Sequence, residues 1–267
     1  MRKKFDSMNL LRLVICSDLR KNLLICLNED KKSLGDLRNE LNISSTTAIH
    51  ALRELEKSNL TFQDKDKNYA LTTIGRIITL KLVDFSDAAE VLKKHERFWL
   101  EHDLGGIPDH MMEKIGWLKG SAVMQINTLD ILKTHSSYVS FIKDANWIKG
   151  VSPIFSADYP IIFKNLVENN VETHLVLTEA VLKKLIYAIS LETFKNLCHN
   201  YKLKVLITDK NIKVAFTVTD SFLSLGLFTN DEIYDTAYDL IGTDNKAISW
   251  GVELFKYYRG KTKEYEI

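Results

Sequence analysis

The sequence is poor in cysteine, and the three cysteines that it has form no metal-binding pattern. Cys16, Cys26 and Cys198 are far apart in a chain of 267 residues. There is no CxxC pair and no paired His/Cys cluster, which excludes the common structural zinc sites. All three lie in apolar stretches, so we expect buried thiols in a reducing cytoplasm. A redox-sensing thiol is the alternative.

The sequence also lacks a long uninterrupted apolar run near its basic amino-terminal segment. The residues Met1-Arg2-Lys3-Lys4-Phe5-Asp6 precede an apolar stretch, but Asp18 and Arg20 interrupt that stretch. This interruption excludes a transmembrane span there and argues against a signal peptide. We therefore expect no membrane partner.

Motifs of common enzyme families are missing as well. There is no Walker-type glycine loop, no GxGxxG and no GxSxG elbow. His95 and His102 are too far apart for a helical zinc pair at i and i+4. The aspartates Asp209, Asp220, Asp231, Asp235, Asp239 and Asp244 fall where turns are expected, and Asp favours turns. We expect no enzyme and no cofactor, with catalysis by paired carboxylates as the alternative.

The charge of the chain is small but unevenly distributed. The net charge is +1, too little for wholesale coating by nucleic acid. Residues 1–80 hold 14 Lys/Arg against 10 Asp/Glu, and the remainder holds 22 against 25. The excess of positive charge at the amino-terminal end agrees in sign with a DNA-binding domain.

Residues 33–76 carry the pattern of a winged helix-turn-helix. Ser33 and Asp36 fit a capping box at the start of a first helix. Asn42 fits a helix end that needs a left-handed residue. Ser44 or Ser45 caps a second helix, whose buried stripe is formed by Ala48, Leu52 and Leu55. A helix held in this way can enter the DNA major groove.

The outer face of that second helix is polar and suited to DNA. Arg53 can reach a guanine edge or a phosphate, and Ile49 can contact a thymine methyl group. Hydroxyl and imidazole groups complete the predicted DNA-contacting set, which is Ser44, Ser45, Thr46, Thr47, Ile49, His50 and Arg53. Thr47 can instead serve partly as a cap. The alternative for the whole pair is an ordinary helical hairpin with a solvated outer face.

A predicted wing follows the two helices and favours DNA binding over that alternative. Residues 61–63 and 68–71 are short strand candidates around the polar turn Asp64-Lys65-Asp66-Lys67. Lys65 and Lys67 are placed to touch the DNA backbone beside the groove. An ordinary solvated turn is the alternative for each lysine taken alone.

The length suggests about two domains, and we predict three parts. Residues 1–80 form the winged helix-turn-helix domain, with a first helix over residues 10–27. A helical pattern from Gly75 to about Asp103 indicates a connector over residues 81–104 that takes part in homodimerisation, with a core helix as the alternative. A dimer would present two reading helices to two DNA half-sites.

Residues 105–267 alternate between strand and helix patterns and predict an α/β domain. Strands are expected at 146–152, 171–177, 203–208, 213–218 and 222–228. Helices are expected at 111–118, 128–142, 159–169, 179–189, 191–200 and 245–258. Alternation followed by an antiparallel pair implies a mixed sheet with helices on its faces. The overall fold class is therefore α/β, or α+β for the whole chain.

This second domain is predicted to bind a small-molecule effector or to dimerise. The loop after the first strand lies at a carboxyl end, where open sheets bind ligands. The residues expected to line a pocket are Trp147, Ser152, Phe155, His174 and Trp250. A place in the hydrophobic core is the alternative for the aromatic residues, and a hydrogen-bonded core histidine is the alternative for His174.

Two elements of this domain resemble a known family. Ile148-x-Gly150-Val151-Ser152-Pro153 and Trp250-Gly251-x-x-Leu254-Phe255-x-x-Tyr258, together with the winged helix, resemble the archaeal family of filament and methanogenesis regulators. The resemblance implies a transcription factor acting on archaeal promoters, with a sensor half similar to the phospholipase D-like domain of sugar-responsive regulators. Phospholipase D itself carries an HxK motif that is absent here, so the resemblance implies no hydrolysis.

These observations predict a homodimeric, sequence-specific transcription regulator that binds double-stranded DNA and senses an effector. Two other classes stay open. One is an enzyme that uses the winged helix only for targeting, and the other is a module that uses it for protein contacts.

Overall fold

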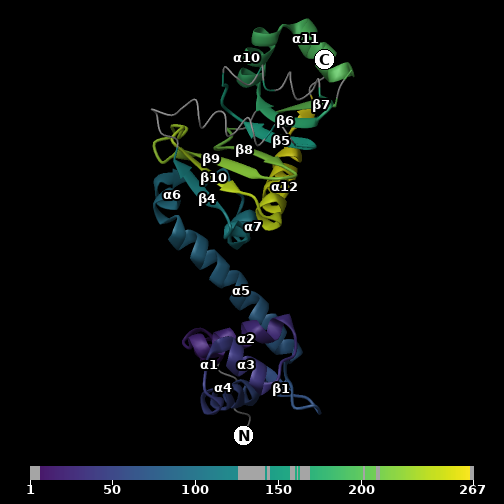
Figure 1. The fold of residues 1–267 in the computed structure, drawn as a ribbon. Coiled ribbons are helices and arrows are strands. Elements are labelled where there is room, and N and C mark those ends of the chain that lie inside the picture. Colours follow the sequence, from purple (N-terminus) through teal and green to yellow (C-terminus); the bar gives the residue numbers. More distant parts are fainter. Residues whose placement is uncertain are drawn as a thin grey trace. The chain divides into compact units, whose positions relative to one another are not determined.

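A computed structural model describes residues 7–125, 142, 145–156, 160, 162, 169–200, 202–208 and 211–264. The chain forms two compact units, Met1–Asp87 and Ala88–Ile267. Figure 1 shows the elements of each unit, and each unit is described by itself.

The first unit is helical with a small hairpin. Its elements are α1 (Ser7–Ile15), α2 (Asp18–Glu29), α3 (Leu34–Leu41), α4 (Ser45–Lys57), β1 (Thr61–Gln63), β2 (Tyr69–Leu71) and the start of α5 (Thr73–Lys94). The two strands pair antiparallel. The order of helix, turn, helix and hairpin is the one predicted for residues 33–76.

The single helix predicted over residues 10–27 is wrong, because the chain breaks between α1 and α2. Ser17 has an extended backbone, and its hydroxyl accepts a hydrogen bond from the Arg20 amide. A serine in this conformation caps a new helix rather than continuing an old one. The break also leaves Cys16 exposed, which corrects the expectation of three buried thiols.

One hydrophobic core holds the first unit together. It joins α2, α3 and α4, and its completely buried leucines are Leu23, Leu24, Leu37, Leu52, Leu55 and Leu60. Gly75 allows the start of α5 to lie against this core, because a Cβ atom at Gly75 would come within 1.8 Å of the Leu60 carbonyl oxygen. The identity of residue 75 therefore fixes the path of the chain out of the wing.

The second unit is an α/β structure. Its helical elements are α6 (Glu96–Glu101), α7 (Asp109–Met112), the 3-10 helix η1 (Ile115–Leu118), α10 (Glu179–Ile189), α11 (Leu191–Asn200) and α12 (Asn245–Arg259). Its strands are β3 (His102–Asp103), β4 (Ala122–Gln125), β5 (Trp147–Ser152), β6 (Glu172–Thr178), β7 (Leu203–Thr208), β8 (Val214–Thr219), β9 (Leu223–Thr229), β10 (Tyr238–Gly242) and β11 (Lys263–Glu264).

These strands form one mixed sheet in the order β11-β7-β6-β5-β8-β9-β10-β4, with β3 beside β9. The pairs β5–β6 and β6–β7 are parallel, and the other pairs are antiparallel. The predicted mixed α/β sheet is confirmed. Strand β4 was missed, and the helices predicted over residues 128–142 and 159–169 lie almost entirely outside the described residues.

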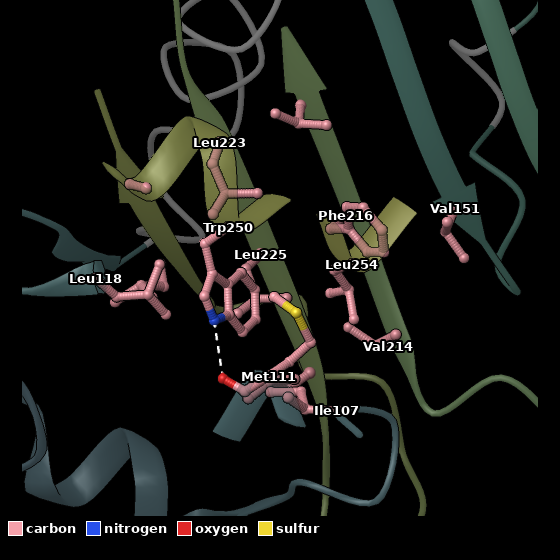
Figure 2. Close-up of a cluster of buried hydrophobic side chains, with 14 of the residues drawn as sticks. Ile107, Met111, Leu118, Val151, Val214, Phe216, Leu223, Leu225, Trp250 and Leu254 are labelled. Atoms are coloured by element: carbon pink, nitrogen blue, oxygen red, sulfur yellow. Dashed lines mark hydrogen bonds between the residues drawn. The ribbon is translucent and has the colours of Figure 1, made fainter. Parts of the chain in front are cut away.

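Helices cover the parallel strands on both faces (Figure 1). Val151 and Val176 belong to a core shared with α12, whereas Leu175 and Leu177 belong to a core shared with α10 and α11. This separation follows from the two-residue period of a strand, in which neighbouring side chains point to opposite faces. Figure 2 shows the α12 core, where the fully buried Trp250 donates its indole N–H to the Met111 carbonyl at 3.0 Å.

Helix α5 contributes to both cores. Leu82 packs in the core of the first unit, and Val91 packs in the core of the second. The helix was predicted to run to about Asp103, but it ends at Lys94. The backbone of His95 departs from helical geometry at φ −118° and ψ 33°, and α6 begins at the next residue.

Candidate nucleic-acid interface

A serine caps the amino-terminal end of each helix in the helix-turn-helix, Ser33 for α3 and Ser44 for α4. Asn42 ends α3 in the left-handed conformation at φ 51° and ψ 51°, and its amide donates to the Arg38 carbonyl. Ser44 is the N-cap of α4, and its hydroxyl accepts a hydrogen bond from the Thr47 amide at 3.1 Å. Ser33 forms the predicted capping box with Asp36 at the start of α3. The turn between the two helices is therefore built from local hydrogen bonds.

One face of α4 is buried and the opposite face is exposed. Ala48, Leu52 and Leu55 have no exposed surface. Thr46, His50 and Arg53 are exposed, and Ile49 between them is partly exposed. Residues three and four apart share a helix face, so these four side chains form one continuous surface. Thr46, His50 and Arg53 form no hydrogen bond or ion pair with any residue that the structure describes.

The remaining predicted residues of α4 have structural partners. Ser44 and Thr47 are both exposed, and their hydroxyl oxygens lie 2.7 Å apart within the cap. Ser45 is partly exposed, and its hydroxyl accepts a hydrogen bond from Arg38 at 3.2 Å. These hydroxyls therefore support the helix end first, and any DNA contact would share them with the cap.

Two basic residues at this surface were not found from the sequence. Lys57 is exposed and lies four residues after Arg53, so it extends the same face. The spacing could have revealed it. Arg38 is exposed on α3 and reaches the start of α4 through its hydrogen bond to Ser45. That contact joins two helices, and the pattern within either helix does not predict it.

The wing is a tight polar turn held by one carboxylate. Asp64 Oδ1 accepts hydrogen bonds from the Asn68 amide at 2.8 Å and the Asp66 amide at 3.0 Å. The Asn68 hydrogen bond and the ion pair with Lys31 hold the pKa of Asp64 below its usual value. Lys65 and Lys67 are both exposed at the tip, and Lys67 has a left-handed backbone at φ 65°.

Ion pairs in the first unit tie the scaffold together and leave the outer face of α4 open. Arg20 on α2 joins Glu54 on α4 at 2.7 Å and donates to the Leu13 carbonyl of α1. Lys32 pairs with Glu40 at 2.7 Å. The Arg20–Glu54 pair ties α4 to α2, and neither pair involves Arg53.

The five residues predicted to line an effector pocket do not form one pocket. Ser152 and Phe155 lie on the α10–α11 face, because Ser152 is in register with Leu177 and Phe155 packs against that core. Trp147 and His174 lie on the α12 face. The prediction gathered all five into one pocket, but Trp147 and Ser152 lie on opposite faces because side chains alternate along a strand.

Trp250 is a core residue, which corrects its assignment to a pocket. It is completely buried, and its only polar group is already hydrogen-bonded to Met111. His174 is also buried, and its Nε2 lies 3.3 Å from Glu172 Oε1. Trp147 is only partly buried, so of the residues on the α12 face it alone keeps part of its side chain exposed among the five that were predicted.

The two inner cysteines are shielded from reaction. Burial raises the pKa of Cys26 to about 11, and a hydrogen bond with Glu40 acts in the same direction. Burial also raises the pKa of Cys198 to about 11. A thiol with a raised pKa holds little of the reactive thiolate at neutral pH.

Fold and site together define a winged-helix protein with a carboxyl-terminal α/β domain. Two family models match the chain: the N-terminal domain of the methanogenesis regulatory protein FilR1 over residues 8–89 and its middle domain over residues 131–261. Together the two models match most of the chain, which belongs to this regulatory family.

A curated relative agrees with this assignment. The methanogenesis regulatory protein FilR1 of Methanothrix harundinacea is 28% identical over 263 residues. The alignment covers 97% of this chain and 58% of that protein, so the chain spans little more than half the length of the relative.

Solved structures give weaker likenesses. TrmBL2, described as an archaeal chromatin protein with a novel mode of DNA binding, is 16% identical with a TM-score of 0.43 and covers 98% of this chain and 100% of its own. MepR, a transcription regulator of Staphylococcus aureus, is 18% identical with a TM-score of 0.27 and covers 49% of this chain and 85% of its own. TM-scores below 0.5 do not establish a shared fold, and the phospholipase D-like sensor domain that the family resemblance implied is not supported.

None of the described helices is both long and apolar enough to cross a membrane. No group of three or more His, Cys, Asp or Glu side chains in the described part of the chain is placed to hold a metal ion.

Proposed function

We propose that this protein is a sequence-specific DNA-binding transcription regulator that reads the major groove with α4. The observation that carries the proposal is the division of α4 into a fully buried face and an exposed face bearing Thr46, Ile49, His50, Arg53 and Lys57. Membership of a regulatory family supports the same function.

In this proposal each exposed group has a distinct role. Arg53 contacts a guanine edge or a phosphate, and Ile49 lies against a thymine methyl group. His50 and the hydroxyl groups of Ser44, Ser45, Thr46 and Thr47 contact bases or phosphates. Lys65 and Lys67 on the wing contact the backbone beside the groove, as do the newly found Arg38 and Lys57.

We propose further that the protein acts as a homodimer through α5. Large apolar side chains of α5 are exposed at helical spacing, namely Ile74, Ile77, Leu80, Phe85 and Leu92. An exposed apolar stripe of this length marks an interface. A second copy of the chain would cover this stripe and place two α4 helices on two DNA half-sites. Residues 81–104 would then connect the winged helix-turn-helix domain to the α/β domain.

Oligomeric state tests this part of the proposal. The Ile77→Glu/Phe85→Glu variant should sediment as a monomer where the wild type sediments as a dimer, because each glutamate would be buried without a partner. Lys93→Glu also adds negative charge to α5 but lies away from the stripe, and should leave the dimer intact. A wild-type protein that is monomeric at micromolar concentration would contradict the proposed dimer.

The second unit is proposed to sense a small-molecule effector and no catalytic role is assigned to it. An effector can change DNA binding only if it binds more tightly to one arrangement of the dimer than to another. The rival functions are an enzyme targeted by its winged helix and a module that uses the winged helix for protein contacts.

A gel-shift series with the promoter upstream of the gene and with random DNA of equal length separates these functions. A regulator should prefer its own promoter, with an affinity that falls as salt rises. Arg53→Ala should weaken specific binding by about 1–3 kcal/mol. The matched control is Arg12→Ala, which removes an exposed arginine from α1 and should leave binding unchanged. Equal and salt-independent affinities for both DNAs would refute the proposed function.

A further inference from the structure

A row of basic side chains crosses the three parallel strands of the second unit. Lys149 on β5 is in register with His174 on β6, and His174 is in register with Lys204 on β7. Residues in register on neighbouring parallel strands point to the same face, and the strands lie about 4.8 Å apart. The three side chains therefore stand side by side near the beginnings of the strands.

Two more cations come from the helix that covers this face. Val151 and Val176, two residues further along β5 and β6, pack in the α12 core. Lys256 and Arg259 lie in the last turn of α12. Burial lowers the pKa of Lys149, and the nearby charges of Lys256 and Arg259 lower it further against the opposing charge of Glu172. We call Lys149, His174, Lys204, Lys256 and Arg259 the basic cluster.

Negative charge is scarce at the basic cluster. Among the side chains that the structure describes, Glu172 alone lies within ion-pairing distance of a member of the cluster, with Oε1 3.3 Å from His174 Nε2. Lys149 is placed instead over the neutral ring of Trp147, with Nζ 3.7 Å from the ring centroid. Burial lowers the pKa of His174, and Lys204, Arg259 and Lys149 act in the same direction against Glu172. The imidazole is therefore neutral at neutral pH and flanked by two ammonium groups.

Structural roles account for only part of the basic cluster. Cations in the last turn of a helix are stabilised by its dipole, which explains Lys256 and Arg259. Lys149 and Lys204 come from strands, where no helix dipole stabilises a cation, although Lys149 does contact the Trp147 ring. Gathered charges of one sign destabilise the fold by repulsion, and they create a local potential that attracts ions of the opposite sign.

The depth of the basic cluster indicates the size of its ligand. Lys204, Lys256 and Arg259 are exposed, Lys149 is partly buried, and His174 is buried. The row from Lys149 to Lys204 spans only two strand spacings, about 10 Å. A rigid DNA backbone would meet the exposed outer lysines but not the inner groups. A compact ligand can reach all of them.

We propose that the basic cluster binds a small oxyanion with two or more negative charges, of the phosphate or polycarboxylate class. The outer cations attract the anion, and Lys149 and the neutral His174 donate hydrogen bonds to its oxygens. Binding itself is independent of the proposed DNA function, and only its regulatory effect rests on that function.

Calorimetric titration of the full-length protein in the absence of DNA tests the proposal. Pyrophosphate and citrate are titrated separately, so that the two arms distinguish a phosphate from a polycarboxylate ligand. We expect at least one of them to bind the wild type, and Lys149→Gln/Lys204→Gln to weaken that binding by about tenfold or more, since each lost charged hydrogen bond is worth over 1 kcal/mol. Lys149→Arg/Lys204→Arg should retain binding, which separates lost charge from lost folding.

The control variant is Lys184→Gln/Lys195→Gln, which removes two exposed lysines from α10 and α11 and should leave the affinity unchanged. The proposal is overturned if neither anion binds the wild type at millimolar concentration, or if the strand variant binds as tightly as the wild type. Loss of promoter binding by the strand variant, without anion binding by the wild type, would assign the basic cluster to DNA instead. Loss of the gel shift by Arg53→Ala is a separate result that bears only on α4.

Discussion

The two units build their candidate sites in different ways. In the first unit the exposed side chains of Thr46, His50 and Arg53 come from one helix, and local caps and a shared core hold that helix. In the second unit Lys149, His174 and Lys204 come from three strands that only the folded sheet brings together. A local site survives small shifts of its surroundings, whereas a site assembled from several strands depends on the whole sheet.

The charges of the two units differ in the same way. Arg20, Lys31 and Lys32 of the first unit each face a carboxylate from another element or turn. These three cations are thus paired, whereas Arg53 on the outer face of α4 forms no ion pair with a described residue. In the second unit the unbalanced charge lies against the sheet itself. The comparison predicts that substitutions will separate stability from binding in the first unit more cleanly than in the second.

The largest effect is expected from Trp250→Ala, which should destabilise the second unit by about 3–5 kcal/mol. The substitution removes the largest fully buried side chain of the α12 core and takes the indole donor away from the Met111 carbonyl. All four tryptophans, Trp99, Trp117, Trp147 and Trp250, lie in the second unit, so the urea unfolding curve followed by tryptophan fluorescence reports on that unit.

The matched variant for the first unit is Leu52→Ala, which removes a completely buried side chain of α4. It should destabilise the first unit by about 2–5 kcal/mol, detected by circular dichroism, and leave the midpoint of the fluorescence curve in place. A fluorescence midpoint that moves equally in both variants would mean that the two units unfold together, and the contrast between them would fail.

The next effect concerns a carboxyl group in the second unit. Burial raises the pKa of Asp239 to about 6, and the charge of Asp235 adds to this against a hydrogen bond from Ser224. Between about pH 4 and pH 6 the folded protein holds a proton that the unfolded chain has released, so this group makes the free energy of unfolding fall as pH rises. The raised pKa limits the destabilisation that Asp239 causes at pH 7 to about 3 kcal/mol. Because the side chain is partly exposed, we expect about 1–2 kcal/mol.

Asp239→Asn should therefore raise the free energy of unfolding at pH 7 by about 1–2 kcal/mol and flatten its decline between pH 4 and pH 6. Urea unfolding at a series of pH values measures both. Asp231→Asn is the control, since Asp231 is exposed and should change neither quantity. An unchanged pH dependence in Asp239→Asn would show that other groups cause the decline.

A smaller effect is expected from loss of the α4 cap. Ser44→Ala removes the acceptor of the Thr47 amide and should destabilise the first unit by about 1 kcal/mol. Thr46→Ala should leave stability unchanged and weaken promoter binding, because the Thr46 hydroxyl makes no hydrogen bond within the cap and is exposed. Thermal unfolding and gel shifts on both variants decide whether the residues that stabilise α4 differ from those that contact DNA.

The smallest effect is expected from Lys57→Ala. If Lys57 contacts a phosphate, its removal should weaken binding to all DNA sequences about equally and reduce the slope of log affinity against log salt by about 1. Lys184→Ala removes a lysine from the second unit and should leave the slope unchanged. A change in sequence preference would instead place Lys57 at a base edge.

Most of the first unit could be predicted from the sequence, because its determinants are local. The capping box at Ser33, the left-handed Asn42 and the stripe of Ala48, Leu52 and Leu55 are all encoded within a few residues. The break at Ser17 was missed because the apolar period continues across it. Ser17 interrupts the helical backbone but not the spacing of the apolar residues.

Much less of the second candidate site could be predicted. Each strand was recognisable, but the register that brings Lys149 beside His174 is a property of the assembled sheet. Trp250 was expected in a pocket because an aromatic residue in a helix pattern does not reveal which face of the sheet it meets. Gathering the residues into one pocket also ignored alternation along β5, which divides Ser152 from Trp147.

Helix α5 has a consequence for the breathing motions of the molecule. Leu82 packs in one core and Val91 in the other. The backbone amides between them should therefore be protected from hydrogen exchange as long as either end of the helix stays folded. The rate of deuterium uptake by residues 83–90 should therefore be set by the more stable of the two cores. A fragment cut at Asp87 would sever seven residues from the helix and fray the end that Leu82 secures.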